Sequence, residues 1–271
     1  MHLAQFFAAH RNVIHVRLTE VRGSSPRDAG AEMFVAIDAA YETIGGGQLE
    51  YMAIDKARAL LRNGSDTERM DVPLGPEIGQ CCGGRVVLTL ERMSETDRNQ
   101  AVAADTRQRA DLPSVFILGA GHVGRALAAL FQHLPVRCIL IDSRAEELSM
   151  CHADVEKRQS VMAEADIRHA PARSAFIVLT HDHALDFLLT SEALDRGDAA
   201  YVGLIGSATK RTKFARFHKD HSSRSGSAGL TCPIGASASR NKRPEVIAAL
   251  VVAEVMTALT APAHSFALAE N

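Results

Sequence analysis

The chain has 271 residues and a formal net charge of −2, and 46% of its residues are hydrophobic, as in an ordinary globular protein. The balanced charge argues against a nucleic-acid-binding protein, which would be strongly basic. No apolar run reaches the length of a membrane span, and the first residues predict a short amphipathic helix rather than a signal peptide.

The first third of the chain alternates short strands with glycine-rich loops. A helix is predicted over residues 48–62, because apolar side chains recur at helical spacing and Asn63-Gly64 is a strong stop signal. Strands are predicted over residues 13–21, 32–37 and 85–90. We therefore expect a smaller N-terminal α+β domain with an antiparallel sheet, covering residues 1–93.

A polar, Ala-rich segment at residues 94–112 predicts a helical linker, with Ser94 and Asp97 in a capping arrangement. After Pro113 strands and helices alternate, which indicates a Rossmann-like doubly wound parallel sheet over residues 113–271 and an α/β class for the whole chain.

In this second domain, a final helix is expected from Pro244, and residues 218–229 read as an exposed loop. Helix 122–131 is expected between the first two strands. The predicted strands are 114–118, 136–141, 175–179 and 200–205.

A glycine loop stands between the first strand and first helix of the predicted parallel sheet. Gly119, Gly121 and Gly124 form a GxGxxG pattern that includes His122, and such a loop lets backbone amides approach a phosphate. Asp142 ends the next strand, where an acidic side chain can hold ribose hydroxyls. The alternative is that the glycines serve only helix–strand packing, since fold alone does not assign function.

Two further polar segments follow strand ends. His181, Asp182 and His183 fit a metal pair, an acid–base pair or anion-binding donors, or Asp182 simply caps the next helix. Ser207 opens a helix whose first turn carries Lys210 and Arg211, which fits either a bound anion or a solvated basic helix face.

The N-terminal domain has three glycine-bearing loops of its own. Ser24, Ser25 and Arg27 lie in a GSSPR turn, and Gly45, Gly46 and Gly47 precede the helix as a candidate anion nest. In the third loop, Cys81 and Cys82 precede Gly83, Gly84 and Arg85. A nearby cation favours thiolate, whereas the alternative is that either cysteine is a small buried hydrophobe.

The five cysteines, which also include Cys138, Cys151 and Cys232, are odd in number and form no CxxC pair. They indicate neither a disulfide framework nor a zinc ribbon, so we expect a cytoplasmic protein.

Taken together, these motifs resemble the XdhC/CoxI family of molybdenum-cofactor accessory proteins over nearly the whole chain. The matching segments are GSSPR at 23–27, IGGG at 44–47, CGG at 82–84, ILGAGHVGRALA at 117–128, THDH at 180–183, YVGLIGSATKR at 201–211 and CPIG at 232–235. Their order and joint presence carry the resemblance. The segment 235–239 departs from the family pattern because it lacks the usual acidic tail.

The resemblance implies a chaperone that binds the molybdenum cofactor in its molybdopterin form, protects it, supports its sulfuration and delivers it to a xanthine dehydrogenase apoenzyme. A cysteine desulfurase is the implied sulfur source, and a homodimer is one option for the oligomeric state. Cys82 matches the family's CGG position and is the implied thiol near molybdenum. Cys81 is an addition whose role stays open.

Two other functions remain open from the residues themselves. One is an NAD(P)-dependent oxidoreductase that uses the GxGxxG crevice, with His181 or His183 as the acid–base catalyst. It leaves the three N-terminal loops without a task. The other is a nucleotide-sensing scaffold in which the Rossmann-like half regulates docking to a target enzyme.

Overall fold

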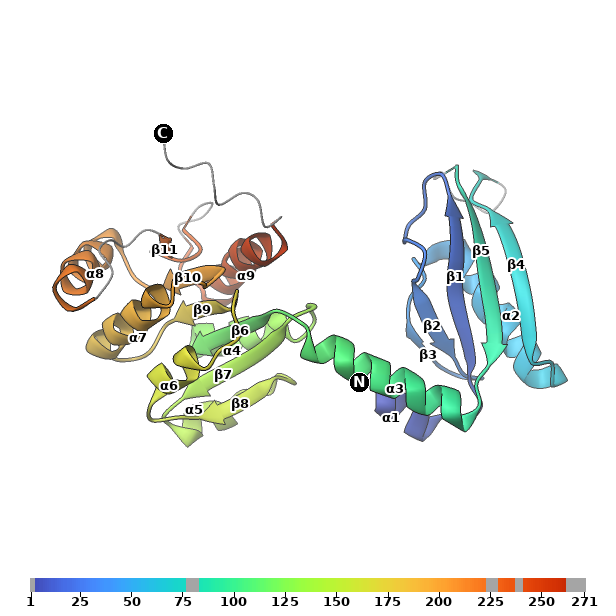
Figure 1. Cartoon of the computed structure of the whole chain (residues 1–271), viewed down its shortest axis with the longest axis horizontal. Helices are drawn as coiled ribbons and strands as arrows, with labels where there is room; N and C mark the ends of the chain where they lie inside the picture. The colour runs from blue at the N-terminus through green and yellow to red at the C-terminus, as the bar shows by residue number, and fades with distance from the viewer. Residues whose placement is uncertain (1–2, 77–82, 223–228, 237–240, 262–271) are drawn as a thin grey trace. The chain divides into compact units, whose positions relative to one another are not determined.

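The computed structural model describes residues 3–76, 83–222, 229–236 and 241–261, which fall into two compact units, Met1–Arg107 and Gln108–Asn271 (Figure 1). One unit holds an antiparallel sheet and the other a parallel sheet, so the predicted α/β class is confirmed. The units divide within helix α3 (Glu95–Ala110), inside the predicted linker. No helix in the described ranges is long and apolar enough to cross a membrane.

The N-terminal sheet has the order β3-β2-β1-β5-β4 (Figure 1). Its central strand β1 (Ile14–Arg22) pairs antiparallel with β2 (Glu32–Val35) and β5 (Arg85–Arg92). The three strands and the antiparallel sheet were predicted, but not the pairing. The edge strands β3 (Ala40–Glu42) and β4 (Thr67–Pro73) were not predicted.

Helix α2 (Gly47–Asn63) covers one face of this sheet by burying Leu49, Ala53, Ala57 and Leu60 against it. It ends at Gly64, whose φ of 78° lies in the left-handed region that favours glycine. On β2, Phe34 joins a separate apolar cluster with helix α1 (Leu3–Ala9). The strand alternation therefore divides this unit's core in two.

The linker helix α3 begins with the expected capping pair. The Ser94 backbone N–H donates to Asp97 Oδ2 at 2.8 Å, and the Asp97 N–H donates back to Ser94 Oγ at 3.2 Å. None of the residues of α3 is buried, which explains its polar composition.

The C-terminal sheet is parallel throughout, with the order β11-β10-β9-β6-β7-β8. Its strands are β6 (Ser114–Leu118), β7 (Arg137–Asp142), β8 (Glu156–Gln159), β9 (Ala175–Val178), β10 (Tyr201–Leu204) and β11 (Leu230–Thr231). From β6 the chain runs outward through β7 and β8, then returns to place β9 on the other side of β6. Ligands of open α/β sheets bind at such a reversal, outside the carboxyl ends of the strands.

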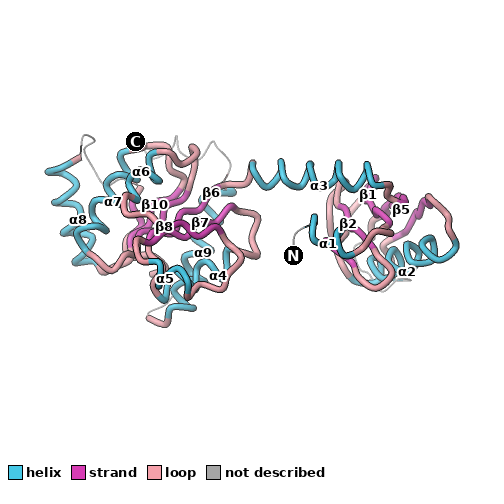
Figure 2. The backbone as a smooth tube through the Cα atoms, turned by 90° about the horizontal axis from the view of Figure 1, so that it is seen from below, coloured by secondary structure: helices cyan, strands magenta, loops and turns pink. Residues whose placement is uncertain are grey.

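Helices cover both faces of this sheet (Figure 2). Val115 and Ile117 of β6 join one core cluster, whereas Phe116 and Leu118 join the other. The first cluster includes α4 (His122–Phe131), α5 (Ala145–Ser149) and α9 (Pro244–Thr260), and the second includes α6 (Ala163–Arg168), α7 (His183–Asp195) and α8 (Ala208–His221). Burial on both faces accounts for the continuous apolar run of β6.

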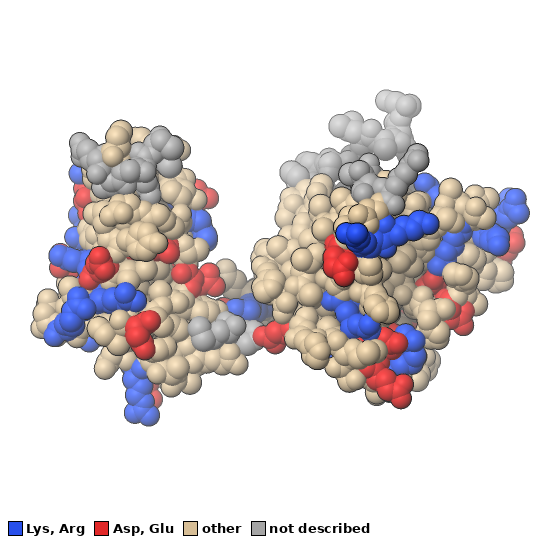
Figure 3. Space-filling view, turned by 180° about the vertical axis from the view of Figure 1, so that it is seen from behind, with Lys and Arg blue, Asp and Glu red and all other residues tan. Residues whose placement is uncertain are grey.

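The predicted exposed loop at residues 218–229 is wrong at its start. Helix α8 continues to His221, and His218 is buried, with Nδ1 2.8 Å from Ser191 Oγ. The ring packs on Phe214 one turn earlier, so a polar residue completes an apolar helix face. On the face shown in Figure 3, basic and acidic side chains intermingle over each unit, in keeping with the net charge of −2.

Candidate functional site

The loops that follow β6 and β9 touch at the reversal of the parallel sheet. A Cβ on Gly119 would lie only 2.4 Å from the carbonyl oxygen of Leu179, and the φ of Gly119 is +127°. Only glycine fits there. The GxGxxG loop and the Thr180–His183 segment, which the sequence placed at separate strand ends, therefore lie side by side.

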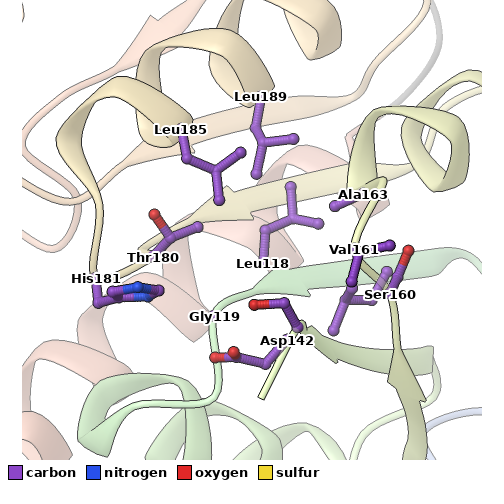
Figure 4. A pocket seen from close by; sticks show the side chains of 12 residues that line it. Leu118, Gly119, Asp142, Ser160, Val161, Ala163, Thr180, His181, Leu185 and Leu189 are labelled. Carbon is purple, nitrogen blue, oxygen red and sulfur yellow. The ribbon is translucent and has the colours of Figure 1, made fainter.

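A cavity of about 90 Å³, partly open to solvent, lies at these strand ends (Figure 4). Leu185 and Leu189 reach it from α7, Leu118 from the end of β6, and Val161 from the segment after β8. The other lining residues are Gly119, Ile141, Asp142, Ser143, Ser160, Ala163, Thr180 and His181. At about 90 Å³ it is smaller than the pockets that enclose a whole small molecule, about 300–1,000 Å³, so it has room for one part of a ligand.

Asp142, the predicted ribose ligand, lines this cavity but already has protein partners. Its Oδ2 accepts from the Ala120 N–H at 2.8 Å and from Arg144 Nη2 at 2.9 Å, and its Oδ1 accepts from Arg144 N and Nε, both at 3.0 Å. Burial opposes ionisation of Asp142, but these hydrogen bonds outweigh it and lower the pKa to about 2. The carboxylate thus fastens the glycine loop to the end of β7.

The histidines at this edge have few partners. His122, His181 and His183 are exposed, and among them only His183 approaches a carboxylate, with Nδ1 4.0 Å from Asp186. Asp182 caps α7 by accepting from the Ala184 N–H at 2.7 Å, as one sequence alternative held. Within the described ranges no three His, Cys, Asp or Glu side chains gather as a metal site would require.

A buried network joins this segment to α8. Asp186 is fully buried, and its Oδ1 accepts from the Thr180 N–H and hydroxyl, both at 2.8 Å, while Lys210 donates to its Oδ2. Lys210 thus already has an internal anion, whereas Arg211 is exposed. Ser207 caps α8 by accepting from the Lys210 N–H at 3.3 Å.

In the N-terminal unit, the predicted loops gather at one end of the sheet. A Cβ on Gly84 would lie 2.1 Å from the carbonyl oxygen of Ser24, and a Cβ on Gly45 would lie 2.8 Å from Pro26 Cβ. The GSSPR turn therefore packs against both the Gly83-Gly84 step that leads into β5 and the glycine loop before α2. Glycine at these positions is a packing requirement.

Two groups in the GSSPR turn have no partner among the described residues. The Ser25 hydroxyl oxygen is buried and forms no hydrogen bond there. The Arg27 side chain is exposed, and no carboxylate of the described ranges pairs with it. A buried unpaired hydroxyl is costly, so Ser25 is a position where a polar ligand atom would be stabilising.

The glycine loop before α2 was predicted as a nest for a ligand's anion, and in the structure it holds a carboxylate of the chain itself. The backbone N–H groups of Ile44 and Gly46 donate to Glu50 Oε2 at 3.2 and 3.1 Å, and the Thr43 hydroxyl also donates to it. An external phosphate at Gly45–Gly47 would have to displace this carboxylate.

The remaining thiols fall into two groups. Cys82, the predicted thiol near molybdenum, and its neighbour Cys81, whose role stays open, both lie outside the described residues. Cys138, Cys151 and Cys232 are free and buried. Burial raises the pKa of Cys138 to about 12, so this thiol is inert at neutral pH.

Comparison with known proteins agrees with this two-unit architecture. A family model described as the XdhC Rossmann domain matches residues 115–255, and a model described as the XdhC and CoxI family matches residues 6–71. The chain belongs to the XdhC and CoxI family. The resemblance stated from the motifs is thus confirmed.

Among solved structures, the XdhC-family chain is similar to one from Bacillus halodurans described as the crystal structure of a xanthine dehydrogenase. The two share 17% sequence identity over 96% of each chain, with a TM-score of 0.74, which shows a common fold. No curated protein matches the chain.

Three functional-site neighbours of this XdhC-family protein escaped sequence reasoning: Glu50, Arg144 and Asp186. Each is a charged residue that hydrogen-bonds to a motif identified from the sequence. Only the spacing of these residues from the motifs could have identified them in the sequence. Glu50 is four residues after Gly46, Arg144 is two after Asp142, and Asp186 shares the buried stripe of α7 with Leu189.

Proposed function

We propose that this protein binds the molybdenum cofactor in its molybdopterin form, protects it, supports its sulfuration and delivers it to a xanthine dehydrogenase apoenzyme. The observation that carries the proposal is the convergence, in the N-terminal unit, of the GSSPR turn, the glycine loop before α2 and the Gly83-Gly84 step. These are the segments by which the chain resembles cofactor-binding members of its family.

The residues at this end of the sheet suit such a ligand. Molybdopterin supplies an anionic phosphate, a polar pterin and, when loaded, a metal centre with an affinity for soft ligands. The exposed Arg27 guanidinium is suited to the phosphate. The unpaired Ser25 hydroxyl is suited to a polar ring atom. Cys82 immediately precedes Gly83 and is the proposed thiol beside molybdenum.

We further propose an accessory role rather than catalysis. Asp182 is used as a helix cap and Asp142 as an anchor of the glycine loop, so neither is free to orient a catalytic histidine. A carrier must also release its cargo, which favours several modest contacts over a closed cage. The proposed partners are the xanthine dehydrogenase apoenzyme and a cysteine desulfurase that supplies sulfur.

The test is to purify the full chain from cells that make the cofactor and to measure bound molybdenum and pterin. Cys82→Ala and Arg27→Ala should each lower the bound molybdenum several-fold and slow activation of added apoenzyme. Arg11→Ala is the matched control, because Arg11 is also exposed but precedes the opposite end of β1. Unchanged molybdenum in Cys82→Ala and Arg27→Ala would reject the proposal, as would substrate-dependent NADH oxidation by the purified chain.

A further inference from the structure

The cavity at the strand ends of the C-terminal unit, called the slot below, has several apolar side chains in its lining. Leu185 and Leu189 of α7 line one part of it, and Val161 and Ala163 from the segment after β8 line another (Figure 4). Val161 is 84% exposed, although it is apolar and lines the slot. A bound ring would remove this side chain from water, which is favourable in proportion to the area covered.

The adjoining glycine loop contains one glycine that the protein's own packing does not require. Gly119 has a left-handed φ, and a Cβ on Gly124 would lie 2.0 Å from the carbonyl oxygen of Gly119. By contrast, Gly121 has a φ of −66°, which any residue adopts, and a Cβ there would meet nothing within 4 Å. The packing alternative therefore explains two of the three glycines and leaves Gly121 unexplained.

A close-approaching ligand accounts for Gly121. It is the N-cap residue of α4, where no side chain caps the helix. A missing Cβ lets an anion approach the free N–H groups of the first turn, where the helix dipole also favours negative charge. Gly119 lines the slot and stands two residues before Gly121, so one ligand with a ring and a phosphate is able to reach both places.

The third feature of this site is the ion pair between Asp142 and Arg144 at the edge of the slot. Four donors saturate the Asp142 carboxylate, and two of them come from the Arg144 side chain. The Arg144 side chain is 35% exposed, and partly exposed pairs contribute little net stability. Two vicinal hydroxyls can take the positions of Nε and Nη2 while the Ala120 N–H stays bound.

We propose that the C-terminal unit binds a purine ribonucleotide, with the base in the slot, the 5′-phosphate at Gly121 and the ribose hydroxyls replacing Arg144 on Asp142. The proposal concerns a site other than the cofactor-binding end of the N-terminal unit. It holds whether or not that unit carries the molybdenum cofactor.

Isothermal titration of the full chain, prepared free of molybdenum cofactor, tests the phosphate site. ADP and NADH are expected to bind, with adenosine at least about tenfold weaker, as for loss of a hydrogen-bonded charged group. Gly121→Ala should weaken ADP by a similar factor. Gly75→Ala is the matched control, because its Cβ also meets nothing within 4 Å and it lies in the other unit. Absence of ADP binding at millimolar concentration, or unchanged affinity in Gly121→Ala, would overturn the proposal.

Two more variants test the ring and the ribose. Val161→Asp should abolish ADP binding without unfolding the chain. Met162→Asp, at a neighbouring residue that is 63% exposed and outside the slot, should leave ADP binding unchanged.

Arg144→Ala should tighten ADP binding about two- to fivefold by freeing Asp142. An ADP affinity of Arg144→Ala equal to or weaker than that of wild type would contradict the proposal that ribose hydroxyls replace Arg144 on Asp142. A preference for NADPH over NADH would contradict it as well. Thermal unfolding of each variant checks the fold. Loss of ADP binding with unchanged molybdenum content would separate this site from the proposed cofactor site.

Discussion

Lys210 donates a hydrogen bond to Asp186, a carboxylate completely buried in the C-terminal unit, and this contact joins the first turn of α8 to the first turn of α7. The alkyl chain of Lys210 lies over Gly206, where a Cβ would be only 2.6 Å from Lys210 Cδ. The pair therefore fixes the loops after β9 and β10 to each other. Glycine at 206 is what lets the lysine reach inward.

Breaking this pair should destabilise the C-terminal unit strongly. Lys210→Met leaves a buried carboxylate without its cation, and the expected loss in unfolding free energy is about 3–5 kcal/mol. Adding Asp186→Asn to Lys210→Met should restore much of the loss, because no unpaired charge then remains buried. Urea unfolding followed by circular dichroism measures the unfolding free energies of the wild type, the two single variants and the double variant. Additive losses from the two substitutions would contradict the coupling.

Adjacent glycines at the start of β5 should respond differently to alanine. Gly84→Ala places a Cβ 2.1 Å from the Ser24 carbonyl oxygen and must displace the GSSPR turn, so a loss of about 3 kcal/mol or more is expected. Gly83→Ala meets no neighbouring atom, and its φ of +67° costs only about 1 kcal/mol. Urea unfolding of the N-terminal unit compares them. Equal effects would mean that the turn does not press on Gly84.

The stabilising effect of Asp142 should disappear in acid. Its pKa falls from the ordinary 3.8 to about 2 on folding, so the ionised carboxylate stabilises the protein above about pH 4 and ceases to do so as pH falls through 2. The difference in unfolding free energy between wild type and Asp142→Asn should follow that course. Unfolding titrations between pH 2 and 7 measure it. A difference independent of pH would show that the charge of Asp142 is not what holds the glycine loop.

The described cysteines should resist thiol reagents. Burial raises the pKa of Cys138 to about 12, and it raises that of Cys232 despite the nearby cations of Lys210 and Arg211. Since the thiolate is the reactive form, both should stay unlabelled at neutral pH until the protein unfolds. Peptide mass mapping after brief alkylation checks this. Rapid labelling of Cys138 in the native chain would refute its burial.

The sequence predicted the fold wherever an element has a clear apolar face. Strands β1 and β6 and helix α2 were all anticipated from apolar periodicity or continuous apolar runs. Strand β8, with the sequence EKRQ, and the mostly exposed edge strand β4 carry no such signal, because sheet pairing rather than burial holds them in place. His218 was misplaced since a polar side chain was taken to mark a loop.

The candidate sites were predicted as motifs, but their internal partners were not. Glycine patterns identified backbone turns correctly, because steric need is local. Whether a turn is open to a ligand depends on a carboxylate or guanidinium brought by a neighbouring element, as Arg144 is brought to Asp142. Periodicity alone does not encode that pairing, since each partner looks like an ordinary surface charge in the sequence.

The carboxylate of Glu50 in the glycine loop before α2 has a consequence for any phosphate that reaches Ile44 and Gly46. The phosphate must displace the Glu50 carboxylate, which is covalently attached to the same chain, so its local concentration does not fall on dilution. Stable binding of a phosphate ligand at this loop therefore requires further contacts between the protein and other parts of the ligand. When those contacts are lost, the Glu50 carboxylate binds the loop amides again and displaces the phosphate.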